Sequence, residues 1–307
     1  MPDRVVEVHG VRGFFPALTP DGDVLSTILD VAESTVPLSR CALDGSKRKI
    51  VFESDAGISW GVSVAAEAGW FVVAVGDLFA SGEANVDLWK VMLDGSGATN
   101  LTADVPGNDA LPYVSANGSC IVFRSGGDGG GKVFRMDAAG QGRSRLTQED
   151  AIETMPALTP DGEWVVFSTN RGRGNKLWIQ RSDGSDGRFL EPERLEVPDT
   201  SMHARFSPDG AWVVFTSDRG GYNDEWPLTP RPQPYGDMWA APVAGGPAVR
   251  LTHNKWEDGP CDWGYVRLPT APGKPNVLKL DGQADDSSLM AATLKSHQAS
   301  PDSNGKP

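Results

Sequence analysis

The sequence is poor in histidine, cysteine and basic residues. Of its 307 residues, four are histidines and three are cysteines. Cys41, Cys120 and Cys261 form an odd set without the spacing of metal ligands, which favours buried free thiols over a disulfide framework or a zinc site. Lysine and arginine number 28 against 41 aspartates and glutamates, so the formal net charge is −13. Because no basic patch opposes this charge, we expect no binding to nucleic acid.

Long apolar runs are also missing. No stretch approaches the roughly 18 consecutive apolar residues that a membrane-spanning helix needs, and Met1 to Arg4 lack the basic and then apolar order of a secretory signal. We therefore expect no insertion into a membrane, and a cytoplasmic location unless a signal sequence precedes residue 1, in which case the protein is periplasmic or secreted. The 36 glycines and 23 prolines predict many turns and few long helices.

A repeat organises most of the chain. Residues 156–168 read PALTPDGEWVVFS, residues 204–216 read ARFSPDGAWVVFT, and weaker copies begin at residues 16, 63 and 112. The turn glycines of the five copies stand at positions 22, 69, 118, 162 and 210. A period of this length indicates a repeat architecture rather than a single irregular domain.

Each repeat reads as four antiparallel strands. The turn after the first strand is followed by two apolar runs, separated by loops, and by a short closing strand that often ends in Leu-Thr. Asp-Gly and Gly-Gly turns between apolar runs are typical of hairpins. One such sheet cannot bury both faces, whereas a ring of sheets can, so the fold class is all-β, a β-propeller of four-stranded antiparallel blades.

The ring is expected to have six blades with an irregular closing blade. A sixth repeat begins near Trp256 but then stops, and the strand expected at Arg4 to His9 could pair with the last blade, so that both chain ends contribute to one sheet. We expect the propeller to span residues 1–284. Residues 285–307 are polar and lack the repeat, which predicts a disordered C-terminal tail.

The Pro-Asp-Gly turn followed by an apolar strand resembles the propeller repeats of the TolB family and of dipeptidyl-peptidase-IV-type N-terminal propellers. The resemblance covers residues 14–264. Two segments point to a smaller group within this resemblance: His203-Ala-Arg-Phe-Ser-Pro-Asp-Gly210 and Trp256-Glu-Asp-Gly-Pro260. They look like the corresponding segments of TolB-related proteins of plants and some bacteria. The resemblance implies a propeller that binds a protein or peptide, although fold alone does not establish function.

Acidic residues stand three positions before a proline of the repeat. Asp109, Glu153 and Glu257 share that register, and Asp258 stands beside the last. If the first strand of each blade is innermost, these carboxylates converge at one mouth of the central channel and attract a cation or a basic group. The alternative is that they are ordinary solvated residues at strand starts. His203 lies close to the same register, either as a hydrogen-bonded structural residue or as part of the site.

The fifth repeat contains an insertion from Gly220 to Gly236. Its four prolines stiffen it, and Tyr222, Trp226 and Tyr235 supply aromatic faces suited to a preformed contact surface. These aromatic side chains could instead fold back and cap the propeller. Both readings remain open on the sequence.

Two segments match functional motifs without the context that these motifs need: one resembles a catalytic nucleophile elbow and the other a phosphate-binding loop. Gly57-Ile-Ser59-Trp-Gly61 fits a nucleophile elbow, but no α/β-hydrolase pattern surrounds it. The loop from Gly126 to Lys132 lacks the Ser or Thr that a phosphate-binding loop places after its lysine. We therefore expect a non-enzymatic, monomeric scaffold that binds a peptide or protein partner at the channel mouth and adjacent loops. The alternative is a propeller hydrolase or lyase that uses the channel carboxylates and His203. We expect no cofactor, with Ca²⁺ at the channel mouth as the one candidate ligand.

Overall fold

The structure is a computed structural model, and it describes residues 5–8, 14–27, 36–55, 59–76, 86–105, 107–126, 131–221, 236–253, 259, 261–263, 265–266 and 290–294. Within these residues the regular structure is almost entirely β-strand, with two short 3₁₀ turns, η1 (Pro192–Arg194) and η2 (Asp218–Gly220). No helix in the described part of the chain is long and apolar enough to cross a membrane.

Five four-stranded antiparallel sheets form the blades, and each follows the chain order of its strands. Blade 1 comprises β2 (Phe14–Leu18), β3 (Val24–Thr27), β4 (Leu38–Cys41) and β5 (Lys49–Phe52). Blade 2 comprises β6 (Ser59–Ala65), β7 (Trp70–Val75), β8 (Asp87–Met92) and β9 (Thr99–Asn100). Blade 3 comprises β10 (Asp109–Val114), β11 (Cys120–Ser125), β12 (Lys132–Asp137) and β13 (Ser144–Arg145).

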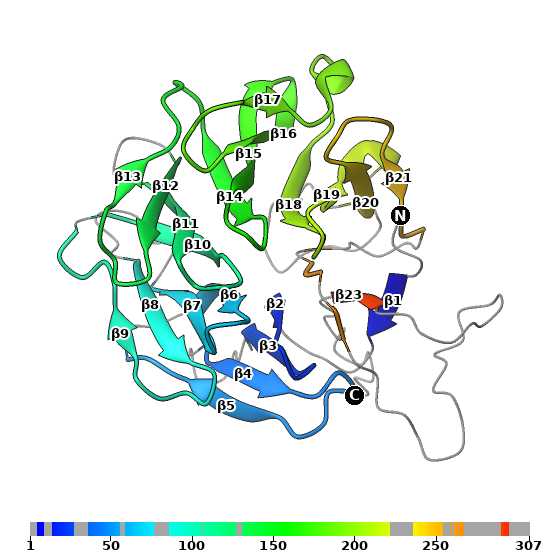
Figure 1. The fold of residues 1–307 in the computed structure, drawn as a ribbon. Coiled ribbons are helices and arrows are strands. Elements are labelled where there is room, and N and C mark those ends of the chain that lie inside the picture. The colour runs from blue at the N-terminus through cyan, green and yellow to red at the C-terminus, as the bar shows by residue number, and fades with distance from the viewer. Residues whose placement is uncertain are drawn as a thin grey trace, which may run out of the picture.

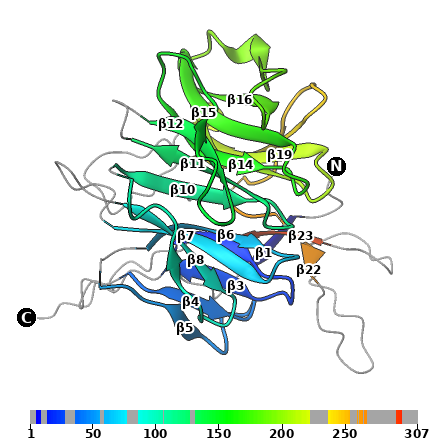
Figure 2. The same cartoon turned by 60° about the vertical axis from the view of Figure 1, so that its left-hand side comes forward.

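Blade 4 comprises β14 (Glu153–Leu158), β15 (Trp164–Gly172), β16 (Gly174–Arg181) and β17 (Arg188–Phe189). Blade 5 comprises β18 (Ser201–Phe206), β19 (Trp212–Ser217), β20 (Asp237–Pro242) and β21 (Val249–Arg250). The blades are arranged around a common centre, with the first strand of each blade innermost (Figure 1). The side view shows neighbouring sheets stacked face to face (Figure 2). The predicted β-propeller of four-stranded blades is therefore confirmed.

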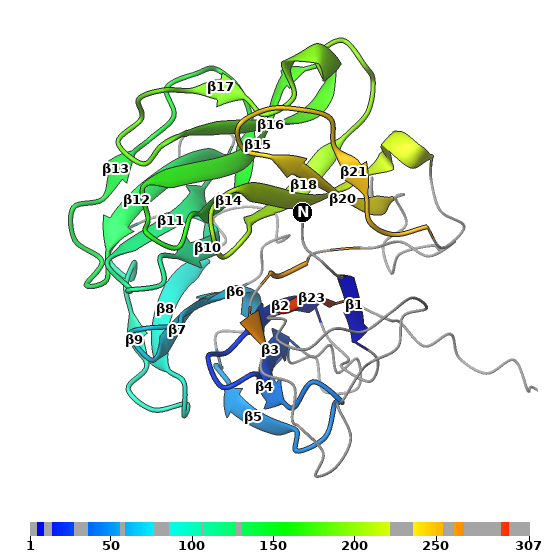
Figure 3. The same ribbon diagram turned by 45° about the vertical axis from the view of Figure 1, so that its right-hand side comes forward.

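The described residues contain five four-stranded blades rather than six. A three-stranded sheet joins β1 (Val5–Val8), β23 (Met290–Leu294) and β22 (Tyr265–Val266), in the order β1-β23-β22. It lies between blades 5 and 1 (Figures 1 and 3). Both chain ends thus contribute to one sheet, as expected. β23 falls inside residues 285–307, which we expected to be a disordered C-terminal tail, and the division of the chain at residue 284 stays a prediction.

The core lies between the blades. Phe123, Phe167 and Phe215 are completely buried on the second strands, where each pairs with an aromatic residue of the third strand. The three cysteines are free and buried, as the sequence predicted. Because each sheet buries both faces against its neighbours, the repeat period alone accounts for most of the apolar core.

Every inner strand is interrupted at one position by a β-bulge. The bulge residue has a positive φ in all five blades: Phe15 (49°), Gly61 (57°), Leu111 (53°), Met155 (56°) and His203 (53°). The strand register shifts at each of these places. A left-handed backbone costs roughly 1–2 kcal/mol for a non-glycine residue, so the packing around it must hold it in place. Because a bulge bends its strand, it changes the direction in which the side chains of the inner strand point.

Candidate functional site

Asp109 and Glu153 begin the inner strands of blades 3 and 4 at the same register, opposite Ser125 and Thr169. Both are buried, at 1% and 0% exposure. Asp109 forms a two-bond ion pair with Arg143, with Oδ2–Nη1 and Oδ1–Nη2 distances of 2.5 and 3.0 Å. Glu153 forms an ion pair with Arg171.

The hypothesis of unpaired carboxylates that await a cation is therefore wrong for Asp109 and Glu153. The sequence did not reveal these ion pairs, because each arginine comes from a later strand or turn of the same blade. In blade 5 the corresponding position is Ser201, opposite Ser217. One oxygen remains to be satisfied in blade 4, since Glu153 Oε2 has no hydrogen-bond partner among the described residues.

The arginines share an aromatic support. Arg143 lies 4.9–5.0 Å from the ring centres of Phe123 and Phe134, and Arg171 lies 4.4 Å from that of Trp178. In blade 5, Arg219 lies 5.0 and 5.1 Å from the equivalent rings of Phe215 and Trp239. A guanidinium above an aromatic ring is favourable, and burial strengthens the attraction.

The carboxylate that pairs with Arg219 lies outside blade 5. Glu191, in the connection between blades 4 and 5, accepts two hydrogen bonds from Arg219, of 2.7 and 2.6 Å. Arg219 also donates to Ser201 Oγ at 3.1 Å, the position held by Asp109 and Glu153 in blades 3 and 4. Three consecutive blades therefore contain the same arginine and aromatic arrangement, assembled from different parts of the repeat.

His203 is the bulge residue of blade 5. Its side chain is 2% exposed and its ring centre lies 6.2 Å from that of Phe15, so it contacts blade 1 across the gap between the first and last blades. Burial, assisted by the nearby charge of Arg205, lowers the pKa of His203 to about 3. The imidazole is therefore neutral at physiological pH.

Arg205 and Tyr113 meet at the centre of the ring. They belong to inner strands two blades apart, β18 and β10, yet the guanidinium of Arg205 lies 4.9 Å from the ring centre of Tyr113. Arg205 donates to the carbonyl of Ala204 at 2.9 Å, and no carboxylate within the described residues forms an ion pair with it. Both side chains are half-buried.

The segment after blade 5 adds a carboxylate to this centre. Asp262 Oδ2 accepts a hydrogen bond from the backbone N–H of Leu18 at 2.8 Å, which links the last blade to blade 1. Burial raises the pKa of Asp262 above its ordinary value, although this hydrogen bond and Arg205 oppose the shift. Burial, and next the charge of Asp262, raise the pKa of Tyr113. We call Tyr113, Arg205 and Asp262 the central cluster.

The repeat contains a signal for this cluster that the sequence analysis missed. At the register of Tyr113 and Arg205, the other three blades have small residues, Ala17, Ser63 and Ala157. Two large polar side chains thus replace small ones at a position that points to the same centre. Tyr113 also packs against the apolar core of the neighbouring blades, so the replacement marks a departure from the repeat and does not by itself indicate a ligand contact.

Glu257, Asp258, Tyr222, Trp226 and Tyr235 lie outside the described residues. Of the insertion, the structure describes only its two ends, Gly220–Gly221 after β19 and Gly236 before β20. Within the described part, no three His, Cys, Asp or Glu side chains are grouped as metal ligands.

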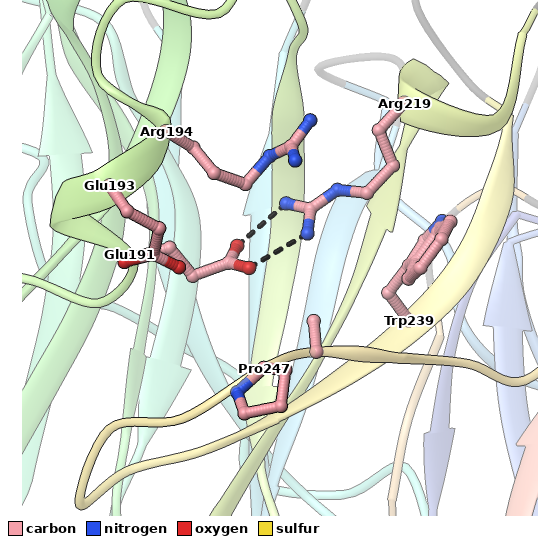
Figure 4. A pocket seen from close by; sticks show the side chains of 7 residues that line it. Glu191, Glu193, Arg194, Arg219, Trp239 and Pro247 are labelled. Carbon is pink, nitrogen blue, oxygen red and sulfur yellow. Dashed lines mark hydrogen bonds and ion pairs between the residues drawn. The ribbon is translucent and has the colours of Figure 1, made fainter.

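A separate pocket opens between blades 4 and 5. The connection between these blades contributes Glu191, Glu193 and Arg194, and blade 5 contributes Arg219 and Trp239 (Figure 4). Figure 4 shows the Glu191–Arg219 pair spanning the pocket beside the indole of Trp239. The sequence analysis did not predict this pocket.

No protein-family model matches the chain. Over 88 residues it is 26% identical to the Tol-Pal system protein TolB of Desulfosudis oleivorans, a match that spans 29% of this chain and 20% of that protein. Among solved structures, TolB from Acinetobacter baumannii superimposes with a TM-score of 0.62 at 17% identity, over 81% of this chain and 59% of that one. A putative TolB from Agrobacterium tumefaciens gives a TM-score of 0.60 at 21% identity, over 77% and 79% of the two chains.

Enzymes also share the fold. An oligogalacturonate lyase in complex with manganese superimposes with a TM-score of 0.51 at 13% identity, over 77% of this chain and 64% of the lyase. Identities this low establish the architecture and not the activity. Together these similarities confirm that the fold of the chain is a β-propeller like that of the TolB structures.

Proposed function

We propose that the chain is a non-enzymatic scaffold that binds a peptide or protein partner at the centre and mouth of the ring and at adjacent loops. The observation that supports this proposal is the central cluster. Arg205 forms no direct ion pair in the described chain, although the charge of Asp262 lies near it, and the equivalent positions of three blades are small. A half-buried guanidinium over an aromatic ring suits a carboxylate or carbonyl of a partner.

The comparison with TolB favours a protein partner. The relative is named as a Tol-Pal system protein, and from this name we propose a protein partner for this chain. The negative net charge of −13 argues against nucleic acid as the partner. We propose that the chain acts as a monomer.

The mouth of the ring belongs to the proposed site as well. We propose Asp109, Glu153 and His203 as residues of its inner strands, and Glu257, Asp258, Tyr222, Trp226 and Tyr235 as its contact residues on the sequence argument. Because Asp109 and Glu153 already have arginine partners, their role in this proposal is to hold the inner strands in place. Ca²⁺ at the mouth depends on Glu257 and Asp258.

The alternative is a hydrolase or lyase that uses the channel carboxylates and His203. A general base works best with a pKa near the operating pH, and that of His203 is lowered to about 3. The carboxylates of Asp109 and Glu153 are engaged by arginine. These observations support the scaffold over the enzyme.

We further propose that the sheet β1-β23-β22 acts as an incomplete sixth blade. It lies in the gap between blades 5 and 1 and joins both chain ends (Figure 1). Such a closing sheet would hold blades 5 and 1 together. On this proposal the closing blade takes its middle strand, β23, from the segment after residue 284.

Peptide selection tests the proposed function. A random peptide library displayed on phage is selected in parallel against the wild type and Arg205→Ala, each with and without Ca²⁺. We expect the wild type to enrich a motif that Arg205→Ala does not. Enrichment of nothing, or of the same motif by both proteins, would refute binding at the central cluster. Enrichment only with Ca²⁺ would support the calcium site.

A further inference from the structure

Arg124 departs from the repeat at its position in the second strand of blade 3. It lies on β11 and pairs with Ala110 of the inner strand. The equivalent residues of the other four blades are small and buried: Thr27, Ala74, Ser168 and Thr216. Arg124, in contrast, is half-buried. Blade 3 therefore has a guanidinium where the packing of the other blades needs only a small side chain.

This guanidinium has few partners. Its Nη1 donates to Asn108 Oδ1 at 3.2 Å, and no other hydrogen bond or ion pair joins it to the described residues. Burial lowers the pKa of Arg124, although the charge of Asp109 opposes the shift. Asp109 itself is engaged by Arg143. A partly buried charge without a counter-ion is unfavourable, so a negative group would stabilise it.

The unbonded edge of the guanidinium, Nε and Nη2, lies between two glycines. A Cβ built at Gly126 would lie 3.2 Å from Nη2 of Arg124, and one at Gly131 would lie 3.2 Å from Nε. Glycine at both positions leaves beside this edge the space that a side chain would fill. Neither nitrogen is among the described atoms that are both buried and unpaired, so the edge is open to solvent.

Backbone hydrogen bonds hold both glycines in place. The N–H of Gly126 donates to the carbonyl of Asn108 at 2.9 Å, and the carbonyl of Gly131 accepts from the N–H of Glu153 at 2.8 Å. The neighbouring Lys132 is already engaged, because its Nζ donates to two carbonyls of the connection to blade 4. The guanidinium is thus the cation that this hairpin offers within the described chain, on a backbone that is already ordered.

An exposed apolar side chain lies next to the same edge. Ile152 is 56% exposed, and its Cγ2 lies 3.6 Å from the Cβ position of Gly131. A free inorganic anion makes no use of such a side chain, whereas an acidic group within a peptide does. Arginine next to exposed apolar surface is typical of protein contact surfaces.

We infer that Nε and Nη2 of Arg124 bind a carboxylate of the partner polypeptide through two parallel hydrogen bonds, with Ile152 against an apolar group beside it. A guanidinium binds carboxylates strongly in this geometry. Arg219 and Glu191 show it within this protein, at 2.7 and 2.6 Å. Either an acidic side chain or a chain end supplies such a group. The inference rests on the proposed function, because it names a group of the same partner, but it uses a different cation from Arg205.

The experiment follows the arginine Nε–H signals of ¹⁵N-labelled protein by NMR, and Arg124→Ser assigns the signal that disappears. Serine suits this place, since Ser168 occupies it in blade 4. The probes are acetyl-Leu-Glu-Leu amide, acetyl-Leu-Gln-Leu with a free C-terminal carboxylate, and acetyl-Leu-Gln-Leu amide, which is neutral. The matched control is Arg173→Ser, which removes an exposed arginine from the equivalent hairpin of blade 4.

We expect a carboxylate peptide to shift the Arg124 signal downfield with saturation, while the neutral peptide leaves it in place. Arg124→Ser should weaken binding at least about tenfold, followed through the backbone amide of Ile152, and Arg173→Ser should stay within about twofold of the wild type. Tighter binding of the glutamate peptide identifies an acidic side chain as the source, and tighter binding of the free carboxylate identifies a chain end. If no carboxylate peptide shifts the signal, if the neutral peptide shifts it equally, or if both variants lose equally, the inference is wrong.

Arg205→Ala separates this result from the proposed function. It should bind the carboxylate peptides like the wild type. Binding that is lost in Arg205→Ala and kept in Arg124→Ser would place the carboxylate at the central cluster, which supports the proposed function and overturns this inference. A saturable shift of the Arg124 signal without any Arg205-dependent binding would support the carboxylate site and refute binding at the central cluster.

Discussion

Blades 3 and 4 differ from blade 5 in where the repeat places its charges. In blades 3 and 4 a carboxylate at the start of the inner strand is neutralised by an arginine of the same blade. In blade 5 that position is Ser201, and Arg219 pairs instead with Glu191 from the connection. The inner strand of blade 5 also contains His203 and Arg205. The difference teaches that blades 3 and 4 use their acids for structure, and that the groups we propose for a partner lie where a blade departs from the repeat.

Replacing His203, the bulge residue of blade 5, should have the largest effect on the free energy of unfolding. Met155 occupies in blade 4 the place of His203 in blade 5, with the same positive φ. The pKa of His203 is lowered to about 3 in the folded state, so between pH 6.5 and 3 the unfolded chain binds a proton that the folded chain does not. This contribution to stability is complete above pH 6.5 and is lost as the pH falls, by about 5 kcal/mol in total.

His203→Met removes the imidazole that binds this proton in the unfolded chain. We expect the wild type to lose about 5 kcal/mol more than His203→Met between pH 6.5 and 3, measured by urea unfolding at each pH. Comparing the change with pH, rather than stability at one pH, separates titration from any packing effect. Parallel pH profiles for the two proteins would show that His203 is accessible to protons in the folded state.

The ion pair of blade 5 gives the next largest effect. Glu191→Gln leaves the guanidinium of Arg219, 5% exposed, without its counter-charge. We expect a loss of about 3–5 kcal/mol in the free energy of unfolding. Glu193→Gln, two residues away and exposed, is the matched control and should change stability by less than about 0.5 kcal/mol. Similar losses for both variants would mean that the charge of the connection matters, and not this pair.

Introducing a carboxylate at Ser201 tests whether blade 5 can form the ion pair that blades 3 and 4 have. Ser201→Asp gives blade 5 the inner-strand acid of blades 3 and 4, at the position to which Arg219 already donates. Added to Glu191→Gln, it should restore about 1–2 kcal/mol of the lost stability, as a double-mutant cycle in urea would show. A further loss on adding Ser201→Asp would contradict the equivalence of the three arginine arrangements.

The architecture could be predicted because it depends on a local pattern. Pro-Asp-Gly turns and alternating apolar runs recur with the period of one blade, and each blade is a chain-consecutive meander. The ion pairs could not be predicted, since Arg143 lies 34 residues from Asp109 and Arg171 only 18 from Glu153. No fixed spacing links an acid to its arginine, and the reach of a long side chain decides the pairing.

The closing sheet and the central cluster illustrate the same limit. β23 has no repeat pattern around it and pairs with β1 across almost the whole chain. Asp262 meets Leu18 in the same way, from opposite ends of the ring. The alignment of repeats does, however, set Arg205 and Tyr113 apart from Ala17 and Ala157, so a comparison of inner-strand positions alone would have found two members of the cluster.

The central claim is that the guanidinium of Arg205 is available to a partner, and calorimetry with a matched pair of variants tests it most directly. Arg181 also lies over an aromatic ring, 4.6 Å from the ring centre of Trp164, but it has Glu163 and Asp186 as ion-pair partners. A peptide enriched on the wild type is titrated into the wild type, Arg205→Ala and Arg181→Ala. We predict binding at least about tenfold weaker for Arg205→Ala, from the loss of a charged hydrogen bond, and unchanged within about twofold for Arg181→Ala. Equal affinity for all three proteins, or an equal loss for both variants, would contradict a partner site at the centre of the ring.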